Sequence, residues 1–227
     1  MIILLIGLCL AVMSVYIYFE GKKNYVAAVI LKGTASLLFV CLGFWCSRAT
    51  SNTDFSKLVR AGLLFGFVAD VLLNLRFLFE KKGKIVFLVG ILVFLIGHIF
   101  YLCALIPTVN NIYIPIIIGA VLTFIILKWL FTQIEAEIAF KIFGVVYIGA
   151  IVIMNCFAVA NLIINPDTRN ILFTVGALLF LLSDIILIIN TFGKESKQVL
   201  RVANLVLYYC GQILIACSLL FPILYIE

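Results

Sequence analysis

Residues 85–106 read IVFLVGILVFLIGHIFYLCALI, an apolar run broken by one histidine, His98. A helix needs about 20 mostly apolar residues to cross the hydrocarbon core of a bilayer. The run is preceded by the lysine-rich segment EKKGK (80–84) and followed by PTVNN (107–111). This stretch therefore predicts a membrane-spanning helix.

Seven further runs of this kind occupy most of the chain, and short polar segments separate them. The eight predicted spans are 1–19, 25–46, 59–79, 85–106, 112–131, 141–163, 170–192 and 201–225. None of the polar segments is long enough to fold by itself. We therefore predict an all-α polytopic protein whose 227 residues form one transmembrane domain, with halves of approximately 1–111 and 112–227.

The composition supports this class of protein. Hydrophobic residues make up 66% of the chain, charged residues 11%, and the mean hydropathy is +1.32. A soluble domain of this length could not bury so much apolar surface. The net charge of +6 lies mainly in the short connections, without a basic face interleaved with aromatics, so nucleic-acid binding is not expected.

The distribution of lysine and arginine predicts the orientation. The first, third, fifth and seventh connections carry eleven of these residues, and the other connections carry four. Cytoplasmic connections are enriched in lysine and arginine. We expect a multi-pass protein of the cell membrane with the odd connections in the cytoplasm and both termini on the other side.

An internal repeat appears at a spacing of 114 residues. Residues 62–70 read GLLFGFVAD, and residues 176–184 read GALLFLLSD. At the same offset, GH at 97–98 matches GQ at 211–212. The third and fourth helices thus correspond to the seventh and eighth, whereas the earlier helices of each half match only by spacing. Four helices per half predict two parallel repeats.

The sequence offers no sign of a metal, a cofactor or a disulfide framework. All seven cysteines lie in or at the edge of apolar runs, where they pack as small hydrophobic residues. The chain lacks HExxH, GxSxG, Walker and GxGxxG patterns in a suitable context. We therefore predict no metal site and no cofactor.

Four ionisable residues lie within the predicted spans: Lys32, Asp70, His98 and Asp184. A charge inside a bilayer costs several kcal/mol unless it is paired or hydrated, so each of these residues is a functional candidate. Lys32 could alternatively form a purely structural ion pair with either aspartate. His98 could equally serve as a hydrogen-bonded packing residue.

Other polar residues accompany these four in the central or cytoplasmic part of the spans. They are Asn74, Tyr101, Asn190, Tyr208 and Gln212. Asn74 follows Asp70 by four residues, so both lie on one helix face. We predict one polar pocket that opens toward the inner leaflet. By contrast, Asn155 and Asn161 are expected to form hydrogen bonds between helices.

The repeat should bring Asp70 and Asp184 close to a shared axis. Two carboxylates in a medium of low dielectric constant should not both stay ionised, so one of them would hold a proton. Such a pair can supply a general acid together with a base or an electrostatic stabiliser.

Five motifs in order resemble the YhhN/TMEM86 family of membrane proteins, the lysoplasmalogenases, over nearly the whole chain. The motifs are LKGTASLLF (31–39), GLLFGFVADVLL (62–73), GHIFY (97–101), GALLFLLSDIIL (176–187) and YYCGQILIA (208–216). Two positions depart from the family pattern. Gly33 replaces the usual proline, and Ala69 replaces the usual glycine.

This resemblance implies an enzyme that cleaves the vinyl ether bond of a lysoplasmalogen, such as the ethanolamine or choline form, to a fatty aldehyde and a glycerophospho-base. It implies Asp70 and Asp184 as the catalytic pair. We further hypothesise that Lys32 binds the substrate phosphate and that Tyr101, Tyr208 and Gln212 orient the ether oxygen, the water or the acids. A lysophospholipid and the membrane lipids are the expected partners.

Two other classes of protein fit the same residues. Repeats with intramembrane acids and a lysine also occur in proton-coupled transporters. A lipid-binding or structural membrane protein would tolerate replacement of both aspartates by asparagine. The sequence leaves the headgroup, the proton donor and the oligomeric state open.

Overall fold

The computed structural model describes residues 1–50, 53–79 and 81–221. Eight helices in this part of the chain are long and apolar enough to cross a membrane, which confirms the predicted all-α polytopic class. The helices are α1 (Ile2–Gly21), α2 (Tyr25–Cys46), α3 (Asp54–Leu75), α4 (Gly83–Leu105), α5 (Tyr113–Gln133), α6 (Ile138–Ile164), α7 (Thr168–Phe192) and α8 (Gln198–Ser218).

Three helix boundaries differ from the prediction by four residues or more. α3 begins at Asp54 instead of residue 59, because the Thr53 side chain caps it by accepting a hydrogen bond from the Ser56 backbone N–H at 3.2 Å. α8 ends at Ser218, and residues 222–225 of the predicted last span lie outside the described residues. α3 ends at Leu75, four residues before the end of the predicted span, so Asp70 lies close to its C-terminal end.

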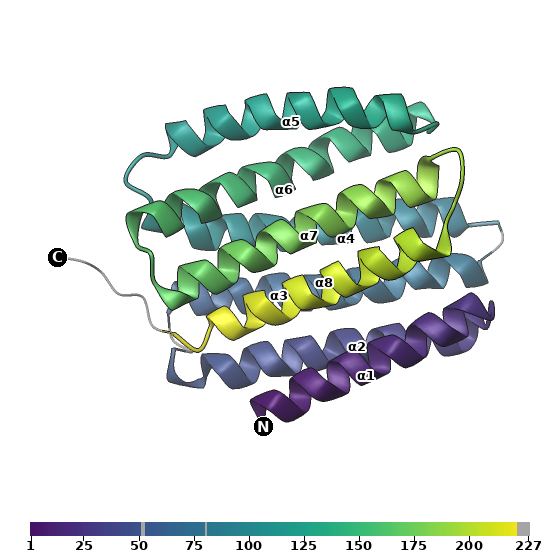
Figure 1. The fold of residues 1–227 in the computed structure, drawn as a ribbon, viewed down its shortest axis with the longest axis horizontal. Helices are drawn as coiled ribbons and strands as arrows, with labels where there is room; N and C mark the ends of the chain where they lie inside the picture. Colours follow the sequence, from purple (N-terminus) through teal and green to yellow (C-terminus); the bar gives the residue numbers. More distant parts are fainter. Residues whose placement is uncertain (51–52, 80, 222–227) are drawn as a thin grey trace.

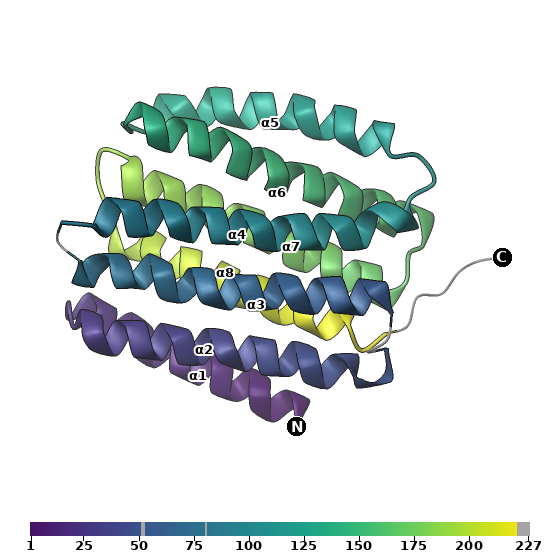
Figure 2. The ribbon, with the colours of Figure 1, turned by 180° about the vertical axis from the view of Figure 1, so that it is seen from behind.

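Six helices form a closed ring, in which each helix contacts the next. The order around the ring is α2, α3, α4, α6, α7, α8, and back to α2. α1 packs outside this ring against α2 and α8, and α5 packs outside it mainly against α6 (Figures 1 and 2). The contact between α4 and α6 and the contact between α8 and α2 are equivalent under the 114-residue offset, as parallel repeats require.

The repeated glycines allow two close helix crossings. A Cβ atom built on Gly97 of α4 would lie 3.2 Å from the Gly62 carbonyl oxygen of α3. A Cβ atom built on Gly211 of α8 would lie 2.7 Å from the Gly176 carbonyl oxygen of α7. Small residues let the backbones of membrane helices approach closely. Each half of the chain therefore uses its glycine pair to join its last two helices.

The four odd connections lie together at one end of the bundle, on the right in Figure 1. There the segment between α5 and α6 is attached to the end of α7. The Glu135 backbone N–H donates a hydrogen bond to the Phe192 carbonyl at 2.7 Å, and Ile134 forms an antiparallel bridge with Gly193. This end of the bundle carries the entrance described next.

Candidate functional site

A cavity inside the ring of helices is lined by both intramembrane aspartates, Asp70 and Asp184. Its volume is about 80 Å³, and a wider vestibule of about 400 Å³ shares lining residues with it at the end of the odd connections. Aliphatic side chains and six phenylalanines form the apolar walls: Phe77, Phe87, Phe94, Phe131, Phe140 and Phe192. The site thus combines a narrow apolar passage with two buried carboxyl groups.

Asp70 of α3 is surrounded by hydrogen-bond donors and a cation. Lys32 Nζ of α2 lies 3.0 Å from its Oδ1. The hydroxyls of Ser36 and Tyr208 each donate to its Oδ2 at 2.5 Å. The Asp70 residue is only 1% exposed. A buried carboxylate with an adjacent ammonium group and two donors is stabilised in its ionised form.

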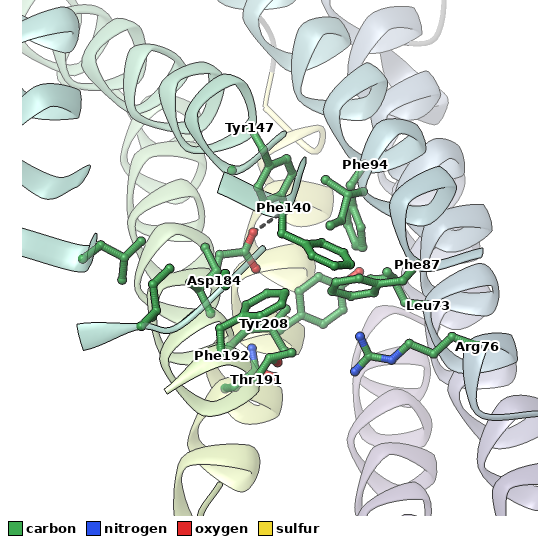
Figure 3. Close-up of a pocket in the computed structure, with 18 of the residues that line it drawn as sticks. Leu73, Arg76, Phe87, Phe94, Phe140, Tyr147, Asp184, Thr191, Phe192 and Tyr208 are labelled. Atoms are coloured by element: carbon green, nitrogen blue, oxygen red, sulfur yellow. Dashed lines mark hydrogen bonds between the residues drawn. The ribbon is translucent and has the colours of Figure 1, made fainter. Parts of the chain in front are cut away.

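Asp184 of α7 has a different environment. It is also buried, and its Oδ2 accepts a hydrogen bond from the Tyr147 hydroxyl of α6 (Figure 3). Among the described residues, no lysine, arginine or histidine nitrogen lies within 4.0 Å of its carboxylate. The two carboxyl groups therefore share one cavity, but only Asp70 has a direct counterion.

The two environments occupy similar positions in the repeat. Lys32 precedes Asp70 by one helix, and Tyr147 precedes Asp184 by one helix. The 114-residue offset relates Tyr147 to Gly33, the neighbour of Lys32. The first half thus places an ammonium group beside its aspartate where the second half places a phenol hydroxyl.

A second polar network lies beside the aspartates and joins α1, α3 and α8. Arg201 donates to Glu20 from Nε at 3.0 Å and from Nη2 at 2.5 Å, and also donates to the Tyr16 hydroxyl at 2.9 Å. The Tyr16 hydroxyl lies 3.2 Å from Asn74 Oδ1. Asn74 and Arg201 line the cavity, so this network forms part of its wall.

Five of the nine predicted site residues line the cavity: Lys32, Asp70, Asn74, Asp184 and Tyr208. Asn190 does not line it. Instead its Oδ1 accepts a hydrogen bond from the Lys197 backbone N–H at 2.7 Å, which fixes the connection between α7 and α8.

His98, Tyr101 and Gln212 form a buried layer deeper in the bundle and are not among the lining residues. The His98 Nδ1 lies 2.8 Å from the Phe94 carbonyl oxygen, and the Tyr101 hydroxyl donates to Gln212 Oε1 at 3.0 Å. The His98 ring packs edge-on against Tyr147, with ring centroids 5.7 Å apart. These three residues can act on the aspartates only through such intermediates.

Several site residues were not identified from the sequence. Ser36 and Tyr147 contact the aspartates, and Arg76 and Arg201 line the cavity. Ser36 lies inside the LKGTASLLF motif, four residues after Lys32, so its helical spacing was a usable signal. Arg76 and Arg201 were expected only to set the orientation in the membrane. A basic residue at a helix end has the same sequence pattern whether it faces water or a cavity.

The donor set does not suggest a metal centre within the described residues. No group of three or more histidine, cysteine, aspartate or glutamate side chains in that part of the chain could hold a metal ion. The acid pair is instead surrounded by hydroxyl and ammonium donors, an arrangement suited to proton transfer.

Of three comparisons with known proteins, one identifies a family. No curated protein and no solved structure gives a significant match to the chain. A family model, that of the YhhN family, matches residues 27–219, a span that contains both aspartates, Lys32 and the paired glycines. This multi-pass membrane protein therefore belongs to the YhhN family, the TMEM86/lysoplasmalogenase family.

Proposed function

We propose that this protein is a membrane-embedded hydrolase that cleaves the vinyl ether bond of a lysoplasmalogen and releases a fatty aldehyde and a glycerophospho-base. One observation carries the proposal: two carboxyl groups from α3 and α7 line one apolar cavity, and only one of them has a counterion. Paired carboxyl groups with different environments can divide the roles of acid and stabilising anion between them.

In this proposal Asp70 remains ionised, because Lys32, Ser36 and Tyr208 all stabilise its negative charge. Asp184 has only a hydroxyl donor beside it, so burial favours its neutral, protonated form. Asp184 is therefore the proton donor, and Asp70 supplies the negative charge that the reaction needs.

Asp184 transfers its proton to the β-carbon of the vinyl ether. The π electrons of the double bond form the new C–H bond, and the carbon attached to the ether oxygen becomes an oxocarbenium ion. The Asp70 carboxylate stabilises this cation electrostatically. Water then adds to the cationic carbon and returns a proton to Asp184. The hemiacetal collapses by breaking the bond from carbon to the glycerol oxygen, which takes up the hydroxyl proton and leaves the aldehyde. A glycosidic bond is cleaved by paired acids in a similar way.

The walls of the cavity suit such a substrate. The phenylalanines can contact the hydrocarbon chain, whereas Asn74 and Tyr208 can orient the ether oxygen or the water. His98 would act indirectly by positioning Tyr147, and Tyr101 and Gln212 by joining α4 to α8. We place the entrance on the cytoplasmic side of the cell membrane, because the odd connections around it carry most of the lysine and arginine.

The test is an aldehyde-release assay with detergent-purified protein and a lysoplasmenyl lipid, without any ion gradient. We expect turnover by the wild type and a loss of about a hundredfold or more in Asp184→Asn and in Asp70→Asn. Thermal unfolding should show that both variants are folded. Absence of turnover in folded wild type, with gradient-dependent uptake in vesicles, would replace this proposal with a transporter. Turnover that survives both substitutions would refute the acid pair.

A further inference from the structure

The basic side chains around the cavity and its vestibule are not all neutralised. In the part of the chain that the structure describes, these residues are Lys32, Arg76, Lys84, Lys141 and Arg201. Three of them form ion pairs: Lys32 with Asp70, Lys84 with Glu137, and Arg201 with Glu20.

Arg76 and Lys141 have no ion pair with any described carboxylate. Both are partly buried and line the inner cavity, Arg76 from the end of α3 and Lys141 from the first turn of α6. A partly desolvated charge without a carboxylate partner is less favourable unless an anionic ligand compensates it. The entrance therefore has two positive charges available for an anion.

Arg76 is held in place by aromatic rings. Its Cζ atom lies 4.6 Å from the ring centroid of Phe77 and 4.2 Å from that of Phe87. These contacts position the guanidinium without consuming its N–H donors, and the side chain extends into the cavity toward Thr191 (Figure 3). Its donors form no hydrogen bond with a described residue, and a planar guanidinium with available donors is suited to two-point binding of a phosphate.

The acids of the entrance do not remove this preference. Glu137 is paired with Lys84, and Glu135 lines only the outer vestibule, where its side chain is exposed. In the inner cavity Asp70 is neutralised by Lys32. Lys32 consequently has its own partner, which makes it a poor candidate for the substrate phosphate.

The spacing along α3 fits a lysophospholipid. Arg76 follows Asp70 by six residues, or about 9 Å at 1.5 Å per residue, toward the vestibule. A glycerol carbon chain and one oxygen separate the ether oxygen from the phosphorus. A lipid with its ether bond at the aspartates would therefore extend its phosphate toward Arg76.

We propose that Arg76 and Lys141 form a phosphate-binding site at the entrance, which anchors the headgroup of a lysophospholipid with its hydrocarbon chain in the cavity. The identity of the lipid rests on the proposed function, but binding of the phosphate does not. Arg76 is then a specificity residue that selects phosphate-bearing lipids.

The experiment compares two uncleavable ligands in a non-ionic detergent free of phosphate. One ligand is a 1-O-alkyl-glycerophosphoethanolamine, and the other is the matching 1-O-alkylglycerol, which lacks the phosphate. Affinity is obtained from the rise in thermal unfolding temperature with ligand concentration. The proteins are wild type, Arg76→Gln, Lys141→Met and the double variant. Arg76→Lys keeps the charge without the planar group.

We expect wild type to prefer the phosphate-bearing ligand about tenfold to a hundredfold. The double variant should lose this preference and keep its affinity for the alkylglycerol. The control variant replaces Lys81 and Lys82, two exposed residues between α3 and α4, by methionine. It should keep the preference. Arg76→Lys should retain part of it, which separates lost recognition from a folding defect.

A preference that survives in the double variant, or that wild type lacks, would overturn the site. A third arm adds inorganic phosphate alone. Stabilisation of wild type that Arg76→Gln loses would support the site and identify free phosphate as a second source of the anion. These ligands are not cleaved, so their binding does not depend on the proposed hydrolase activity. If the lysoplasmenyl lipid gave no aldehyde, the proposed hydrolase would be refuted, whereas the phosphate site would stand.

Discussion

The Tyr147 hydroxyl donates a hydrogen bond to the Asp184 carboxyl group, and the two residues come from adjacent helices of the second half of the chain. Tyr147 is buried, with 8% of its surface exposed, and it lines the cavity. The bond fixes the orientation of the proposed proton donor and would stabilise the carboxylate that remains after proton transfer.

Replacement of this tyrosine tests that role. We expect Tyr147→Phe to lower turnover about tenfold to a hundredfold, because a hydrogen bond to a charged group contributes about 1.5–3 kcal/mol. The measurement is the initial rate of aldehyde release. Tyr113→Phe is the matched control, since Tyr113 is 70% exposed at the start of α5. Equal rates for the two variants would exclude a role of the Tyr147 hydroxyl in the reaction.

The ion pair between Lys32 and Asp70 predicts a dependence of stability on both partners. Lys32→Met leaves a buried carboxylate without its counterion and should lower the free energy of unfolding by about 3–5 kcal/mol. The double variant Lys32→Met, Asp70→Asn should recover much of this loss, as measured by thermal unfolding in detergent. Additive losses in the double variant would contradict direct coupling of the two residues.

The buried pair of Arg201 and Glu20 should also contribute to stability. Its side chains are 16% and 11% exposed, so Arg201→Met should lower the free energy of unfolding by about 3 kcal/mol or more. The exposed pair of Asp54 and Lys57, separated by 3.2 Å, is the control. Lys57→Met should cost at most about 1 kcal/mol. Similar effects of both substitutions would contradict the importance of burial.

The close contact between α7 and α8 depends on the absence of a side chain at Gly176. A Cβ atom there would lie 2.7 Å from the Gly211 carbonyl oxygen, and a backbone atom cannot easily move aside. Gly176→Ala should therefore lower the free energy of unfolding by about 1–3 kcal/mol. Gly7→Ala, where nothing lies within 4 Å, should be neutral or stabilising by up to about 1 kcal/mol. Chemical denaturation in detergent measures both values.

The orientation in the membrane can be tested with reporters. A C-terminal fusion that is active only in the cytoplasm should be inactive. A cysteine introduced in place of Lys82 should react with a membrane-impermeant thiol reagent only after the cells are permeabilised. The prediction follows from the concentration of lysine and arginine in the odd connections. An active C-terminal reporter would reverse the orientation and place the entrance outside.

The fold was accessible from the sequence because spanning helices need long apolar runs, which composition reveals directly. The start of α3 was not accessible in this way. Its first turns contain Asp54, Ser56, Lys57 and Arg60, and such polar residues have the same pattern in a loop as in the solvated end of a helix. The Thr53 cap that extends the helix is a single side chain with a weak sequence signal.

The site was predictable where the repeat marked it. Asp70 and Asp184 occupy equivalent positions in two matching motifs, and both line the cavity. Tyr147 lies in the half-repeat that matches poorly, and a tyrosine in an apolar run has many packing roles. The partner of Gln212 lies on α4, so it depends on how two helices face each other. His98 bonds a carbonyl of its own helix, and Asn190 bonds the connection that follows α7, and hydropathy patterns specify neither contact.

The two sides of the vestibule are held by bonds of unequal strength. On one side the main chain of Glu135 and Ile134 is joined to the end of α7. Across the vestibule, an exposed ion pair between Lys84 and Glu137 at 2.5 Å connects the start of α4 to the start of α6. Ion pairs in water contribute at most about 1 kcal/mol and weaken with salt. Raising the ionic strength would thus weaken the link between the starts of α4 and α6 and leave the main-chain link to α7 unchanged.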